Sequence, residues 1–183
     1  MSVTTEKPKP EYSIYVACLA AYNNGYLHGA WIDATQEPEE IEAEVQAMLA
    51  MSPVPKSEEW AIHDYDLGGV SISEYESFAT VSAIAKAVEE HGSAFAAYIG
   101  HVGIEYSAQD WDAVIEQFRE AYRGEYVSMA NFAEEWASDC YGLDAIPAWL
   151  ANHIDWESLG KEMELDSFWN AESPSGVYVF ERK

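Results

Sequence analysis

The fold of this chain begins with the stretch PEYSIYVACLAAYNNGYLHGAWIDAT, which occupies residues 10–35. An apolar run at residues 14–21 is rich in β-forming residues, and the triplet Asn-Asn-Gly at 23–25 interrupts it. The glycine of this triplet can adopt the positive φ that a tight turn requires, and the asparagine before it tolerates that conformation well. A second run, residues 26–33, then returns. The stretch therefore predicts an antiparallel hairpin.

A helix is predicted directly after the hairpin. Proline is favoured in the first turn of a helix, so Pro38 predicts a start that is capped by Thr35 or Gln36. The run Ser-Pro-Val-Pro at residues 52–55 predicts its end. Between these limits apolar residues recur at spacings of three and four, which predicts one buried face made of Ile41, Val45, Met48 and Leu49.

A strand at residues 59–64 is predicted to follow this helix. Strict alternation would put Trp60 and Ile62 on one side of it, and Ala61 and His63 on the other. The first module is then ββαβ, a small sheet with one helix packed against it.

The rest of the chain changes to a helical and then to a mixed pattern. Helices are predicted to begin near Ser73, Ser93, Ser107, Ser128 or Asn131, Pro147, and Asp155 or Ser158. Strands are predicted at residues 122–127, 167–169 and 177–181.

The predicted fold class is α+β, in an elongated chain of three small domains: a ββαβ module, a helical module and a mixed α+β C-terminal module. Modules this small have little core, and their mutual repulsion favours an extended chain. The predicted parts are a flexible tail at 1–11, an N-terminal α+β domain at 12–69, a helical domain at 70–121 and a C-terminal α+β domain at 122–183.

The charge balance is the most unusual property of the sequence. Its 183 residues contain 33 acids against 9 bases, for a net charge of −24, while 49% apolar residues provide enough material for a folded core. Such a surface repels nucleic acid and membranes, and it attracts proteins whose binding sites are basic. Solubility or adaptation to salt would also explain the acidity of any single segment.

The distribution of the acids favours a functional surface. Residues 10–118 contain 19 acids but only two bases, Lys56 and Lys86. Five glutamates fall within residues 37–44, a helical length of about 12 Å at roughly 1.5 Å per residue. This is about one charge per 2.4 Å, close to the value of about one per 1.7 Å for duplex DNA.

No catalytic or cofactor site is predicted. The group His63, Asp64 and Asp66 is a weak candidate metal site, and no Cys or His cluster has the spacing of a zinc site. Adjacent glutamate pairs point apart on a helix or strand, so they are poor acid–base pairs. Cys140 lies in an acidic region that would raise the pKa of a thiol, which argues against a nucleophile.

The predicted compartment is the cytoplasm. Two distant cysteines in apolar contexts, Cys18 and Cys140, indicate buried, reduced thiols. The first nine residues are polar and do not resemble a signal peptide, and no apolar run approaches the length of a membrane span.

The opening pattern Tyr-Val-Ala-x-Leu-x-x-Tyr-Asn-x-Gly-x-Leu-His-Gly-x-Trp-Ile-Asp, at residues 15–33, resembles the ArdA family of antirestriction proteins. These acidic DNA mimics are made by mobile genetic elements and phages. The resemblance implies three small domains, a homodimer formed through the C-terminal domain, and binding to the specificity and methyltransferase subunits of type I restriction–modification enzymes. Four of the seven tryptophans lie at 122–183, and the bases Arg119, Arg123, Lys161 and Arg182 at or near this range would make self-association less costly there.

The stretch at residues 131–144 looks like the family's antirestriction motif. An amphipathic helix that only packs, or that forms the dimer contact, is an equally good interpretation. The residues assigned to this motif or to the dimer interface are Phe132, Glu134, Glu135, Trp136, Asp139, Cys140 and Tyr141.

The sequence thus predicts an antirestriction protein that mimics the charge and shape of duplex DNA and blocks the DNA-binding site of a type I restriction–modification enzyme. It predicts no enzyme activity, cofactor, metal, nucleic acid or membrane partner. The alternative is an acidic adaptor or immunity-type inhibitor of another basic DNA-binding protein. The predicted DNA-mimic surface consists of Glu37, Glu39, Glu40, Glu42, Glu44, Glu58, Glu59, Asp64, Asp66, Glu74, Glu76, Glu89, Glu90, Glu105, Asp110, Asp112 and Glu116.

Overall fold

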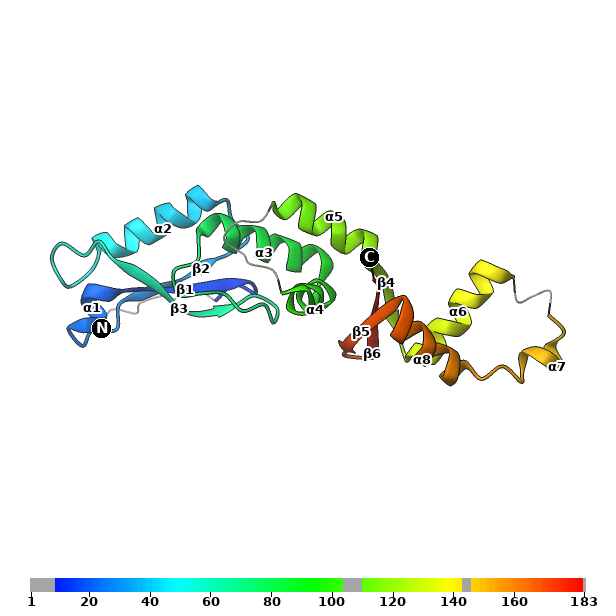
Figure 1. Cartoon of the computed structure of the whole chain (residues 1–183). Helices are drawn as coiled ribbons and strands as arrows, with labels where there is room; N and C mark the ends of the chain where they lie inside the picture. The colour runs from blue at the N-terminus through cyan, green and yellow to red at the C-terminus, as the bar shows by residue number, and fades with distance from the viewer. Residues whose placement is uncertain (1–8, 104–109, 143–145, 183) are drawn as a thin grey trace. The chain divides into compact units, whose positions relative to one another are not determined.

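A computed structural model describes residues 9–103, 110–142 and 146–182 of the chain (Figure 1). The chain divides into two compact units, residues 1–111 and 112–183, and each contains a three-stranded antiparallel sheet with helices. The predicted α+β fold class is confirmed. The predicted boundary at residues 69 and 70 lies within the first unit, and the division into three domains stays a prediction.

The sheet of the first unit has the strand order β2-β1-β3. Its central strand β1 (Ser13–Cys18) pairs antiparallel with β2 (Gly29–Asp33) and with β3 (Trp60–Asp66). The predicted hairpin is therefore confirmed, and its turn glycine, Gly25, has a φ of 81°.

The first strand ends earlier than predicted, at Cys18. Residues 19–23 form a short helix, α1 (Leu19–Asn23), because the Cys18 thiol accepts a hydrogen bond from the Ala21 amide at 3.4 Å and caps it. Alanine-rich sequence also favours the helix over a strand. The chain consequently leaves the sheet several residues before the turn.

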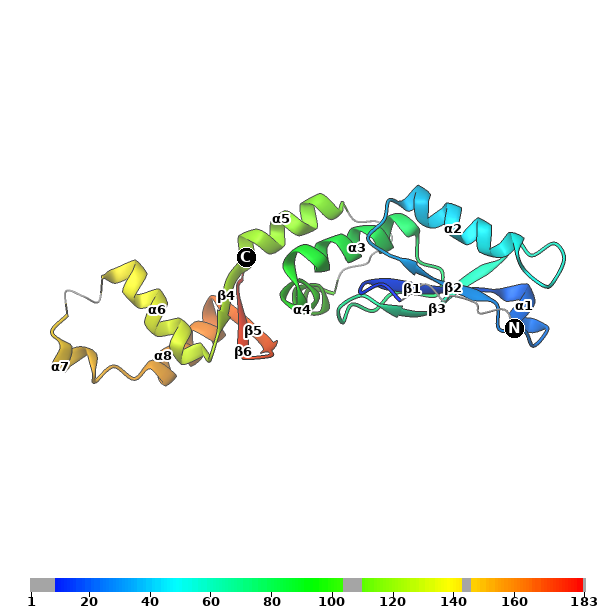
Figure 2. The ribbon, with the colours of Figure 1, turned by 180° about the vertical axis from the view of Figure 1, so that it is seen from behind.

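Helix α2 (Pro38–Ala50) has the predicted buried face. It begins after Glu37 rather than after Thr35 or Gln36, and the Glu37 amide donates to the Glu40 carboxylate at 3.2 Å. Thr35 is not the cap because its amide and its hydroxyl both donate to Asp33. Both views place α2 and α3 on the same side of the sheet (Figures 1 and 2).

Strand β3 departs from the predicted alternation at His63. The pairing to β1 shifts between Tyr15 and Val16, which face Asp64 and Ile62, so that His63 is the extra residue of a bulge. Residues 60–62 pair regularly with β1, which leaves Trp60 and Ile62 on one side and Ala61 on the other; Ala61 and Ile62 are both buried, and His63 is exposed.

Two helices complete the described part of the first unit. Helix α3 (Phe78–His91) begins after its cap Ser77 and not near Ser73, because the preceding segment instead pairs with β3: the Ile62 amide donates to the Glu74 carbonyl at 2.9 Å. Helix α3 ends at His91, before Gly92, and α4 (Ser93–Val102) begins at the predicted Ser93. The predicted cap of the next helix at Ser107 lies outside the described residues.

The second unit has the predicted mixed order of elements, although several boundaries differ. Its elements are α5 (Trp111–Ala121), β4 (Tyr122–Tyr126), α6 (Met129–Tyr141), α7 (Ala148–Ala151), α8 (Trp156–Asp166), β5 (Phe168–Ser173) and β6 (Gly176–Glu181). The sheet order is β4-β6-β5. Ser128 and Asp155 cap α6 and α8, as predicted.

Both faces of this second sheet are packed. On one face, Phe132 of α6 joins Phe168 and Val179 in a buried cluster. On the other face, Trp169 stacks on Phe180 at 4.1 Å between ring centroids, and Phe118 of α5 lies 6.3 Å from Phe180. The alternation of β6 divides its side chains between these two layers.

Within the described ranges, no helix is long and apolar enough to cross a membrane. The two cysteines differ in exposure. Cys18 is buried in the first unit, as predicted, whereas Cys140 near the end of α6 is exposed, so the prediction that both thiols are buried is wrong.

Candidate protein-binding surface

Helix α2 separates its apolar and acidic residues onto different faces. Ile41 and Val45 are fully buried, whereas four glutamates of this segment are exposed. A fifth, Glu44, is half-buried and accepts a hydrogen bond from the side-chain Nε2 of Gln36 at 3.2 Å. We call Glu37, Glu39, Glu40, Glu42 and Glu44 the α2 acidic face.

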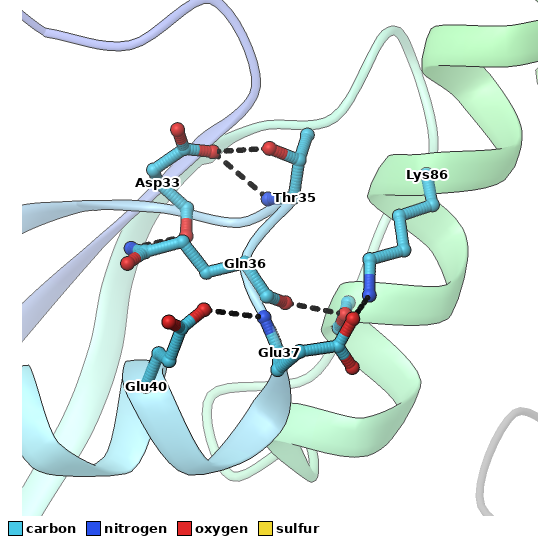
Figure 3. A network of polar contacts seen from close by, with 7 residues as sticks. Asp33, Thr35, Gln36, Glu37, Glu40 and Lys86 are labelled. Carbon is cyan, nitrogen blue, oxygen red and sulfur yellow. Dashed lines mark hydrogen bonds and ion pairs between the residues drawn. The ribbon is translucent and has the colours of Figure 1, made fainter.

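The start of α2 is held by a network of polar contacts (Figure 3). Lys86 of α3 forms an ion pair with Glu37 at 2.8 Å, and the Ser82 hydroxyl donates to the Gln36 carbonyl at 2.6 Å. These contacts fix the α2 acidic face to the neighbouring helix. Lys86 neutralises one of the five glutamates and leaves the charge of the face strongly negative.

Most of the other acids assigned to the surface are exposed. This holds for Glu58, Glu59, Asp64, Asp66, Glu74, Glu89, Glu90, Asp110, Asp112 and Glu116. Asp66 forms an exposed ion pair with Lys9, and Glu116 lies 3.9 Å from Arg119. Glu105 lies outside the described residues.

Glu76 is a correction to the predicted surface. Its side chain is buried, with 8% relative exposure, and its carboxylate accepts a hydrogen bond from the Ser77 amide at 3.2 Å. The backbone of this segment is held by a hydrogen bond from the Ile62 amide to the Glu74 carbonyl and by a turn from the Glu76 amide to the Ser73 carbonyl, and the buried Glu76 cannot contribute to an exposed acidic face.

The residues assigned to the motif at 131–144 divide between core and surface. Phe132 is fully buried in the core of the second unit and is therefore not available to a partner, which corrects its assignment to an interface. Trp136 packs on Phe132 with 5.6 Å between ring centroids and is half-buried. The exposed members are Glu134, Glu135, Asp139, Cys140 and Tyr141.

The exposed carboxylates of α6 lie beside a tyrosine of the sheet. Burial raises the pKa of Tyr126, and the charges of Glu135 and Asp139 raise it further, whereas Arg123 lowers it. The Tyr126 hydroxyl donates to the Arg123 carbonyl at 3.0 Å, which holds the ring in place. The Tyr126 ring thus has a fixed position close to the exposed carboxylates of α6.

The metal-site alternative receives no support from the geometry. Among the described residues, no three or more His, Cys, Asp or Glu side chains are placed to hold a metal ion. His63, Asp64 and Asp66 are exposed residues of the bulged edge strand β3.

Sequence reasoning missed two depressions beside α1 in the first unit. One is lined by Leu19, Glu58, Glu59, Trp60 and Tyr75, and the other by Leu19, Tyr22, Asn23, Ile62, His63, Tyr65, Ile72 and Glu74. Aromatic residues next to acids were visible in the sequence, at residues 58–60 and 74–75. Their convergence depends on contacts between segments that are distant in the chain.

Residues 14–173 match the model of the family described as antirestriction protein (ArdA). The chain belongs to the ArdA family. The resemblance seen at residues 15–33 is therefore confirmed, and the match reaches through both compact units. No curated protein matches the chain.

Membership of the ArdA family implies an antirestriction function and binding to restriction–modification enzymes. This family consists of inhibitors that do not act by catalysis.

Proposed function

We propose that this protein inhibits type I restriction–modification enzymes by occupying their DNA-binding site in place of duplex DNA. The partner surfaces would be those of the specificity and methyltransferase subunits, whose lysine and arginine side chains neutralise phosphates when DNA is bound. Carboxylates at a similar spacing offer these side chains a comparable electrostatic field. We expect this to take place in the cytoplasm, in a host that carries a mobile element.

The α2 acidic face is the observation that carries the proposal. Its glutamates project from a helix whose opposite face is buried in the unit, so the charges are held on a fixed scaffold. Solubility alone requires only that charges be exposed. It does not require five acids within eight residues, with Lys86 as the single base that pairs with them in the described part of the chain.

We also propose that the protein acts as a two-fold homodimer formed through residues 122–183. The second unit exposes large apolar side chains, with Tyr141 at 80%, Trp149 at 69% and Leu165 at 84% relative exposure. Aromatic residues are enriched at protein interfaces, and charged residues are depleted at their centres. A dimer would double the number of acidic surfaces presented to one enzyme.

The function is tested by competition with DNA. Labelled duplex DNA bound to a type I methyltransferase core is titrated with the full-length protein at increasing salt concentrations. Mimicry predicts complete displacement of DNA and an affinity of the protein for the core that falls steeply as salt rises, because many exposed charge pairs contribute.

Two results would contradict the proposal. One is a ternary complex in which DNA and the protein occupy the core together. The other is an affinity of the protein for the core, measured without DNA, that does not depend on salt, since this would indicate an apolar binding site. A matched measurement in cells compares restriction of unmodified phage with and without the protein, and inhibition predicts more plaques with it.

A further inference from the structure

The first depression beside α1 combines an aromatic wall with a carboxylate rim. Its lining comes from three places in the chain: Leu19 of α1, Glu58 to Trp60 at the start of β3, and Tyr75 of the segment before α3. The depression has a volume of about 440 Å³. It is therefore large enough to accept the end of a long side chain.

The walls of this pocket are fixed by contacts within the unit. The Trp60 indole stacks on Phe78 at 4.5 Å between ring centroids, with 20° between the planes. The Leu19 amide donates to the Glu59 carbonyl at 3.0 Å, and the Ile62 amide holds the segment that carries Tyr75 through the Glu74 carbonyl. A partner side chain would thus meet a pocket that is already formed, which lowers the entropic cost of binding.

The rim carries negative charge that no base among the described residues neutralises. Glu58 and Glu59 are exposed, and neither forms an ion pair with a base in the described ranges 9–103, 110–142 and 146–182. Tyr75 is 67% exposed although it lines a pocket. An apolar occupant would leave these carboxylates beside it without a partner, whereas a cation would be complementary to them.

We propose that this pocket, which we call the Trp60 pocket, holds the guanidinium group of an arginine side chain from a basic protein partner. A planar guanidinium stacks on aromatic rings and donates several hydrogen bonds in a fork that matches carboxylates. The apolar stem of arginine suits Leu19, while its head reaches the glutamate rim. The inference rests on the proposed function, because the type I enzyme would supply the arginine.

The pocket gives the inhibitor a contact that duplex DNA cannot reproduce in the same form. Exposed carboxylates attract both lysine and arginine, and they favour arginine only where their geometry accepts its fork of hydrogen bonds. An aromatic wall distinguishes them, because it favours the flat and more weakly hydrated guanidinium. The Trp60 pocket would therefore add selectivity for arginine to a surface that otherwise recognises positive charge.

The first test uses two peptides and the full-length protein. Acetylated, amidated tetra-arginine and tetra-lysine carry the same charge, and their binding is followed by the NMR signal of the Trp60 indole. Tetra-arginine is expected to bind about two- to fivefold more tightly than tetra-lysine. Tyr75→Ala should remove this preference, and Glu59→Gln should weaken tetra-arginine binding.

The controls are residues of the same kind outside the pocket. Tyr26→Ala removes another exposed tyrosine of the same unit, and Glu89→Gln removes one charge from α3. Both should retain the preference for arginine. Equal affinity for the two peptides in the wild-type protein would overturn the proposal. So would a Tyr75→Ala variant that behaves like Tyr26→Ala, or a Trp60 signal that neither peptide moves.

The second test separates this inference from the proposed function. In competition with DNA for the methyltransferase core, Tyr75→Ala is expected to weaken the protein about two- to fivefold more than Tyr26→Ala. Equal effects of the two variants, with full competition by the wild-type protein, would overturn the pocket and leave DNA mimicry intact. If the wild-type protein does not compete at all, the proposed function fails, and the peptide measurement decides the pocket alone.

Discussion

The two units carry almost the same density of negative charge on different scaffolds. Residues 1–111 contain 18 acids and 4 bases, and residues 112–183 contain 15 acids and 5 bases. The net charges are therefore −14 in 111 residues and −10 in 72. The expectation that low net charge makes the C-terminal part the cheaper place for self-association is not supported by these counts.

The units differ in how their bases are used. In the first unit, Lys86 forms an exposed ion pair with Glu37. In the second unit, Arg123 forms an ion pair with Glu181 across β4 and β6, and Arg182 donates to the Phe168 carbonyl at 2.8 Å. The arginines thus add polar contacts between the strands of the second sheet, whose two faces are also packed with buried aromatic residues. The difference shows that units of similar charge density place their few bases in different roles.

The largest losses of stability are expected from substitutions of buried residues in the core of each unit. Phe132→Ala should destabilise the second unit by about 3–5 kcal/mol, because it removes a buried ring and leaves a cavity. Ile41→Ala should destabilise the first unit by about 2–5 kcal/mol for the same reason. Hydrogen exchange measured by mass spectrometry is expected to lose protection only in the unit that carries the substitution. Equal loss in both units would show that they unfold as one.

The next largest effect is expected from charge reversal, which tests which unit carries the acidic residues that bind the enzyme. Reversal of Glu39, Glu40, Glu42 and Glu44 to lysine should lower affinity for the methyltransferase core by about 100-fold or more, if each exposed pair contributes up to about 1 kcal/mol. The matched control reverses four exposed acids of the second unit, Glu157, Glu162, Glu164 and Glu172, and sedimentation verifies that this variant keeps the oligomeric state of the wild-type protein. The affinity of this control variant for the core should fall less, because only the long-range attraction between the two proteins is reduced. Equal losses would assign binding to net charge and not to the α2 acidic face.

A smaller loss of stability is expected when a helix cap is removed, and this loss should depend on pH only where the capping group is a carboxylate. Hydrogen bonds from the backbone amide and the hydroxyl of Ser158 hold the pKa of Asp155, the cap of α8, below its ordinary 3.8. A carboxylate with a lowered pKa in the folded state stabilises it above the ordinary value, and this contribution disappears as the pH falls through the folded pKa. Asp155→Ala should therefore lower the melting temperature at pH 7, and its difference from wild type should shrink below about pH 4.

The control for this measurement is the cap of α3. The Ser77 hydroxyl accepts from the Thr80 amide at 3.1 Å, and it does not titrate. Ser77→Ala should consequently lower stability by the same amount at both pH values. A constant effect of Asp155→Ala across the same range would show that its charge does not contribute to the cap.

The smallest effects on stability are expected from breaking the ion pairs Lys86–Glu37 and Arg123–Glu181. Lys86→Gln should change the free energy of unfolding by about 0–1 kcal/mol, because the lysine and Glu37 are both exposed. Arg123→Gln should cost more, since Arg123 and Glu181 are less exposed and Arg123 also donates to the Tyr122 carbonyl. Chemical denaturation of both variants measures the difference. A larger cost for Lys86→Gln would contradict this interpretation of the two scaffolds.

Local patterns predicted the helices and the hairpin well. The spacing of Ile41, Val45 and Met48 placed the buried face of α2, because a helix repeats every 3.6 residues whatever surrounds it. Likewise, Gly92 ended α3, since its positive φ does not continue a helix. These features depend on neighbours in the sequence.

Two of the predictions that failed depend on distant contacts, whereas α1 and the cap of α2 were missed although their hydrogen bonds are local. His63 lies in a bulge because of the register between β1 and β3, and Glu76 is buried in a segment that a hydrogen bond from β3 holds. Neither effect leaves a signal in the residues themselves. The acidic surface was predictable for a different reason, since an unpaired carboxylate is too costly to bury and most such residues must therefore be exposed.

The central claim is that inhibition rests on many exposed carboxylates, each with a modest effect. A series of single charge reversals along residues 37–116, measured by competition against duplex DNA for the methyltransferase core, tests it most directly. We predict that each reversal, such as Glu40→Lys, weakens competition severalfold at most, because one exposed ion pair contributes only about 0–1 kcal/mol. One reversal that abolishes competition alone, while its neighbours have no effect, would contradict the claim and indicate a hot-spot interface.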